Sequence, residues 1–153
     1  MPGVVRGALR VIRGRSVRAR ACALALLREL LVAAPGCLAE HAARVVRTLT
    51  PALADRGTAS SMKIETLVFV VWLVRGHGRG MRAHAAALLP AVLACVHDPF
   101  YKVTAEALRV LQTLVKVMRP LGTPELMLHY ITTNVNTTKR LFYFIDSAHL
   151  QTH

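Results

Sequence analysis

The spacing of apolar residues along the chain predicts helices, most clearly between residues 87 and 122. Two apolar stripes at helical spacing run through this stretch, with Asp98 and Pro99 between them. An aspartate can cap a helix and a proline suits its first turn, so this pair predicts a tight turn and the start of a second helix, which should end at Arg119 and Pro120. Such a hairpin cannot bury its own apolar faces and must stack against others. The stripes are Leu88, Leu89, Val92, Leu93 and Val96, and then Val103, Ala107, Val110, Leu114 and Val117.

Two further helix pairs precede this hairpin. The first comprises residues 3–12 and 16–34, and the second residues 37–55 and 61–75. In the second helix of every pair a small residue follows an apolar one by four positions. These residues are Val17 and Ala21, Met62 and Thr66, and Val103 and Ala107. The offsets of 45 and 41 residues between equivalent positions are typical of HEAT or armadillo units. The sequence therefore predicts an all-α fold, a right-handed α-α superhelix of about three helix pairs.

Some segments fit this pattern less well. Pro51 should bend the helix over residues 37–55 or end it early, and Glu40 should pair with Arg44 across one helical turn. The glycine-rich residues 76–80 predict a loop. After Gly122 the helical stripe is lost, so we expect a solenoid over residues 1–121 and a divergent, irregular tail over residues 122–153.

The charge is strongly positive and unevenly spread. The formal net charge is +12, and seven arginines precede the first acidic residue, Glu29. One interpretation is an arginine-rich mitochondrial targeting peptide. The pattern favours the other, a helix with Val4, Ala8 and Val11 toward a core and its arginines in solvent, because the arginines occupy positions that repeat proteins leave exposed. The exposed arginines would then be Arg6, Arg10, Arg13 and Arg15.

The basic charge also raises the question of nucleic-acid binding. Arginines neutralise phosphates, but single-stranded nucleic acid also needs aromatic side chains on which bases stack. Aromatic residues make up only 5% of the chain and are not interleaved with the basic ones. The sequence does not favour nucleic acid as the partner, and an acidic protein or a solvated face explains the arginines as well.

No residue pattern supports catalysis, a cofactor or a metal. Cys22, Cys37 and Cys95 are odd in number and form no CxxC pair, which predicts a reducing compartment without disulfides. The spacings of His77, His84 and the Cys95–His97 pair lack the doubled ligand pairs of zinc sites. Residues 76–80 lack the spacing of a phosphate-binding loop, and the apolar run 67–74 is too short to span a membrane. We therefore expect no enzyme, no catalytic, cofactor or metal-binding residue, and no small-molecule substrate or membrane partner.

Several segments resemble a known family. In chain order, these segments are residues 15–20 (RSVRAR), 60–67 (SSMKIETL), 89–96 (LPAVLACV), 98–103 (DPFYKV) and 114–121 (LVKVMRPL). Together they resemble the cullin-associated and neddylation-dissociated family. The resemblance covers about residues 4–121. It implies a HEAT-repeat solenoid, cytoplasmic or nuclear, that wraps unneddylated cullin–RING scaffolds and promotes exchange of their substrate receptors. It also implies that members are not enzymes but act by competition. Binding of the member to the scaffold disfavours binding of the substrate receptor, and binding of the receptor disfavours the member in the same way.

Three functional interpretations follow. The first is a non-enzymatic interaction protein related to cullin–RING ligase assembly. The second is a general basic helical-repeat adaptor for nucleic acid or acidic proteins. The third is a truncated isoform with no activity of its own. The resemblance assigns no individual residue to a cullin contact.

Overall fold

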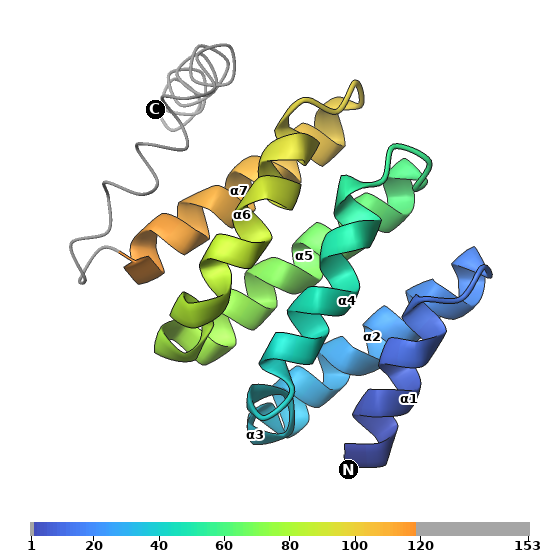
Figure 1. Cartoon of the computed structure of the whole chain (residues 1–153), viewed down its shortest axis with the longest axis vertical. Coiled ribbons are helices and arrows are strands. Elements are labelled where there is room, and N and C mark those ends of the chain that lie inside the picture. The colour runs from blue at the N-terminus through green and yellow to red at the C-terminus, as the bar shows by residue number, and fades with distance from the viewer. Residues whose placement is uncertain (1, 119–153) are drawn as a thin grey trace, which may run out of the picture.

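A computed structural model of the chain describes residues 2–118, which form a stack of helix pairs in two layers (Figure 1). The elements are α1 (Pro2–Ile12), α2 (Val17–Ala33), α3 (Pro35–Ala39), α4 (Ala42–Ala54), α5 (Ser60–His77), the 3-10 helix η1 (Gly78–Met81), α6 (Arg82–Val96) and α7 (Tyr101–Met118). No strand occurs in this part of the chain, so the all-α prediction is confirmed.

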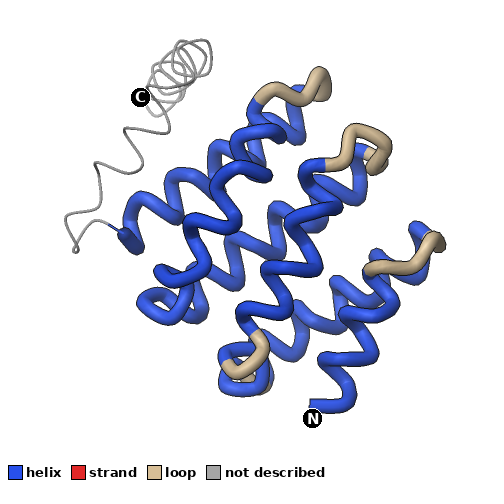
Figure 2. Tube along the Cα trace, in the orientation of Figure 1, coloured by secondary structure: helices blue, strands red, loops and turns tan. Residues whose placement is uncertain are grey.

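The two layers arise because each pair contributes one helix to each. The first layer holds α1, α4 and α6, and the second layer holds α2, α5 and α7 (Figure 1). Within the layers α4 packs on α6, α2 on α5 and α5 on α7, while α1 packs on α2 and α6 on α7 across the layers. The turns within the pairs follow one another along one edge of the stack, and the links between pairs lie at the opposite edge (Figure 2). This arrangement is the predicted helical-repeat solenoid.

One apolar core runs through all three pairs. It extends from Val5 in α1 through Leu27 and Phe69 to Leu114 in α7, and each of these side chains is buried. The equivalent residues Val17, Met62 and Val103 each lie in the first turn of a second-layer helix, as the sequence repeat predicts. Met62 and Val103 are buried, whereas Val17 is 50% exposed.

The first helix buries only Ala8 of the three residues predicted to face a core. Val4 and Val11 are exposed, and the buried residues of α1 are Val5, Ala8, Leu9 and Ile12. Apolar residues stand on both sides of this helix, so periodicity alone cannot decide which side meets α2 and α4. The exposure predicted for the four arginines at positions 6, 10, 13 and 15 is confirmed.

The helix predicted over residues 37–55 is divided. The five-residue α3 ends at Ala39, and α4 begins at Ala42. Glu40 therefore precedes the helix that contains Arg44, and the predicted ion pair between them is not formed. Pro51 does not end α4, which continues to Ala54, and the N–H of Asp55 still donates to the Pro51 carbonyl at 3.0 Å.

Two predicted turns differ in detail. Gly76 and His77 complete α5, and the rest of the glycine-rich segment forms η1, in which Gly78 takes the positive φ of 39° that favours glycine. Asp98 does not cap α7, which begins only at Tyr101, but its carboxylate accepts the N–H of Phe100 at 2.9 Å in the preceding turn. Pro99 likewise precedes the helix. The predicted tail, residues 122–153, lies outside the described residues.

Between residues 2 and 118, none of the helices combines the length and the apolar character that crossing a bilayer requires.

Candidate interaction surface

A buried ion pair joins the second helix pair to the third. The Lys63 ammonium in α5 donates to the Asp98 carboxylate at 2.9 Å, and their side chains are only 9% and 8% exposed. Asp98 stands in the turn between α6 and α7, where it also accepts the Phe100 N–H. Because burying either charge alone is costly, the pair is stable only while both helix pairs keep this geometry. The pair thus holds adjacent repeats in register.

The surroundings of Asp98 shift its pKa. Burial alone would raise it, but the hydrogen bond from Lys63, the N–H of Phe100 and the charge of Lys63 together hold the pKa of Asp98 below the ordinary value of 3.8. The ionised form is therefore favoured in the folded chain.

Acid should weaken this junction. A folded pKa below the unfolded one contributes stability that is complete above the unfolded value and is lost as pH falls through the folded value. We expect the stability difference between the wild-type chain and Asp98→Asn, measured by urea unfolding, to shrink as pH falls from neutrality to below 3.8. A difference that is constant across this range would contradict the assignment.

The cysteines occupy three different environments. Cys22 is exposed, Cys37 is partly buried and Cys95 is buried, and none is disulfide-bonded. The Cys95 thiol donates to the Leu53 carbonyl at 3.4 Å. Burial raises the pKa of Cys95 to about 11, with nearby Lys63 lowering it and Asp98 raising it by smaller amounts. The Cys95 thiol is thus a core group that links α4 to α6.

Alkylation should separate these thiols. The thiolate is the reactive form, so iodoacetamide at neutral pH should modify exposed Cys22 quickly and Cys95 only after unfolding. Peptide mass spectrometry over a time course measures each rate, with a urea-unfolded sample as the reference. Equal native rates for Cys22 and Cys95 would show that Cys95 is not held as described.

The histidines of the described residues do not converge on a metal site. Across residues 2–118, no cluster of three or more histidine, cysteine or acidic side chains could hold an ion. His77 ends α5, His84 lies in the first turn of α6 and His97 follows its last residue. Burial lowers the pKa of His77, which favours its neutral form.

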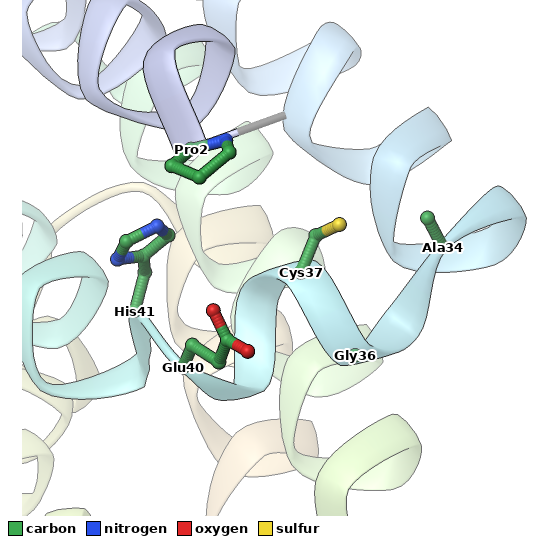
Figure 3. A pocket seen from close by; sticks show the side chains of 6 residues that line it. All are labelled: Pro2, Ala34, Gly36, Cys37, Glu40 and His41. Carbon is green, nitrogen blue, oxygen red and sulfur yellow. The ribbon is translucent and has the colours of Figure 1, made fainter.

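A pocket at the link between the first two pairs brings a cysteine near a histidine (Figure 3). Its volume is about 310 Å³, and Pro2, Ala34, Gly36, Cys37, Glu40 and His41 line it. The Cys37 sulfur points away from the His41 ring in Figure 3, so the two do not form a nucleophile and base. The pocket contains no catalytic arrangement.

Exposed arginines stand on α1, in the turn after it and on α4, and a hydrogen bond from Arg13 to Thr48 joins these neighbouring parts of the first layer. We call Arg6, Arg10, Arg13, Arg44 and Arg47 the arginine patch; all five are exposed. The Arg13 guanidinium donates to the Thr48 hydroxyl at 3.2 Å, and this hydroxyl donates to the Arg44 carbonyl at 2.9 Å. These bonds join the end of α1 to the middle of α4. The two ion pairs of the described residues, Lys63–Asp98 and Glu106–Arg109, do not involve the patch.

An apolar groove lies beside the arginine patch, between α4 and α6. Its volume is about 420 Å³. It is lined by Ala43, Val46, Arg47, Thr50, Pro51 and Ala54 of α4 and by His84 and Ala87 of α6. Arg47 belongs to both features, so the patch and the groove form one continuous surface.

The outer face of the second layer is different. It exposes Val32 of α2 and Trp72 of α5, at 65% and 48%. Each helix of this layer contains a glutamate, namely Glu29, Glu65 and Glu106. This face therefore combines acidic with large apolar side chains, unlike the arginine-bearing face of the first layer.

Comparison with known proteins decides the family. A family model described as CAND1-like, TPR repeats matches residues 36–145. The chain belongs to this CAND1-like family. The matched range begins and ends later than the resemblance over residues 4–121 predicted, and its last part lies outside the described residues.

Relatives from distant organisms support the assignment. Cullin-associated NEDD8-dissociated protein 2 of Rattus norvegicus is 41% identical over 128 residues, which are 83% of this chain and 10% of that protein. Cullin-associated NEDD8-dissociated protein 1 is 41% identical over 79% of the chain in Drosophila melanogaster, and 42% identical over 76% in Arabidopsis thaliana. The CAND1-like chain spans about 10% of the length of each of these relatives.

Proposed function

We propose that this CAND1-like chain is a non-enzymatic interaction module that binds an unneddylated cullin–RING scaffold and takes part in the exchange of substrate receptors, in the cytoplasm or nucleus. The family match carries the proposal, because the relatives are named for their association with cullins. The structure supports it through a helical stack that offers two extended outer faces. A solenoid of this kind acts by shape and surface.

Retention by purified complexes tests the proposal. The immobilised 153-residue chain should retain unmodified cullin–RING complex at micromolar concentration and retain the NEDD8-modified complex less. The two complexes have the same protein components and differ in the modification, so each is the control for the other. No retention of the unmodified complex, or equal retention of both, would contradict the proposal.

A general basic adaptor is the second candidate. The net charge of +12 and the arginine patch favour it, and they would suit phosphates as well as carboxylates. A gel-shift titration with single-stranded RNA across salt concentrations tests the nucleic-acid form, because phosphate binding must weaken steeply as salt rises. Retention of the RNA with that dependence, without retention of cullin, would favour the adaptor.

A further inference from the structure

The two layers differ in composition in a way that the proposed function does not explain. The first-layer helices α1, α4 and α6 contain no aspartate, no glutamate and no aromatic residue. All aromatic side chains of the described residues lie elsewhere, namely Phe69, Trp72, Phe100 and Tyr101. Arginine is the charged residue of these three helices, so their outer face presents positive charge without internal compensation.

The arginine patch is partly preorganised. Thr48 fixes the Arg13 guanidinium against α4, and Arg44 and Arg47 project from the exposed side of the same helix. The core is on the other side, where Val45 and Leu49 are buried. Guanidinium groups bind carboxylates through paired, charge-assisted hydrogen bonds, and a group already held in place loses less freedom on binding.

The groove beside the patch gives the surface a second recognition element. Ala43, Pro51 and Ala87 are short, apolar side chains, and the space of about 420 Å³ between them can admit a leucine or methionine side chain. Its position against Arg47 would place an apolar anchor next to bound carboxylates.

We infer that the outer face of α1, α4 and α6 is a docking surface for an acidic protein segment that carries apolar anchors, with the carboxylates on the arginine patch and an anchor in the groove. Charge complementarity identifies the occupant. The absence of aromatic residues from these three helices argues against single-stranded nucleic acid, whose bases stack on aromatic rings. The inference names a partner chemistry and does not depend on the cullin proposal.

Fluorescence polarisation tests the surface with a synthetic probe. The probe is a fluorescein-labelled peptide of glutamates interrupted by leucines four positions apart, and the reference is the same peptide with glutamate at every position. The full chain should bind the leucine-containing probe more tightly. Arg44→Glu with Arg47→Glu should weaken binding by about tenfold or more, because like charges then face the peptide.

The control variant makes the same charge change on the other layer. Arg18 and Arg75 are exposed residues of α2 and α5, so Arg18→Glu with Arg75→Glu should leave the dissociation constant within about twofold if patch contacts dominate. Circular dichroism checks that both variants remain helical. Equal weakening by both variants, no binding of the probe at micromolar concentration, or tighter binding of labelled oligouridylate than of either peptide would overturn the inference. Each result is independent of cullin retention.

Discussion

Replacing Lys63 by methionine should lower the free energy of unfolding by about 3–5 kcal/mol, because it leaves the buried Asp98 carboxylate without its partner. The two side chains are less than one-tenth exposed, so solvent cannot substitute for the lost ammonium. The Phe100 N–H would remain as a donor to Asp98, but it carries no charge. Equilibrium urea unfolding followed by circular dichroism measures the loss.

The exposed ion pair of α7 is the matched control for Lys63→Met. Arg109 reaches Glu106 at 3.0 Å, but its side chain is 60% exposed. Arg109→Ala should therefore cost less than about 1 kcal/mol. Adding Asp98→Leu to Lys63→Met should recover much of the loss, because no unpaired charge then remains buried. A loss for Lys63→Met as small as that for Arg109→Ala would contradict the structural role of the pair.

Replacing Leu27 by alanine should cost about 2–5 kcal/mol, since it removes a buried leucine from the middle of α2. Leu27 is 0% exposed, and the neighbouring Leu26 is 43% exposed. Leu26→Ala makes the same chemical change one position away, and should shift the free energy of unfolding by less than about 1 kcal/mol. The same unfolding experiment gives both values, and similar costs would show that α2 is not packed as described.

The repeat was predictable because its signal is periodic and long. Helical spacing of apolar residues and the positions of two turns were enough to predict α5 and α7. They also gave the equivalent positions of Met62 and Val103. Each second-layer helix packs on at least two other helices, so it carries many apolar residues at regular helical spacing. The element types followed directly from this pattern.

What the sequence left undetermined depends on neighbours in space. Lys63 and Asp98 are 35 positions apart, and the available signal was a lysine inside an otherwise apolar stripe. The wrong stripe in α1 has the same origin, because Val4 and Val5 each fit a helical periodicity and only the positions of α2 and α4 decide between them. No residue near Ala39 strongly predicts that the helix ends there.

The candidate surface was predictable only in its chemistry. The net charge and the early arginines pointed to an acidic partner or a solvated face. That Arg13 meets Thr48, and that Arg47 borders an apolar groove, follows from the register of α1, α4 and α6 in the first layer. Composition therefore predicted exposed positive charge, and packing decided where the basic surface lies.

Differential scanning calorimetry of the chain tests most directly whether the helix pairs share one core. Unfolding of the described residues as a unit should absorb on the order of 80 kcal/mol, from about 0.7 kcal/mol per residue near 60 °C. The structure predicts a single transition whose calorimetric enthalpy equals its van't Hoff enthalpy. Several transitions, or a calorimetric enthalpy well above the van't Hoff value, would show that the pairs unfold independently and would contradict a continuous core.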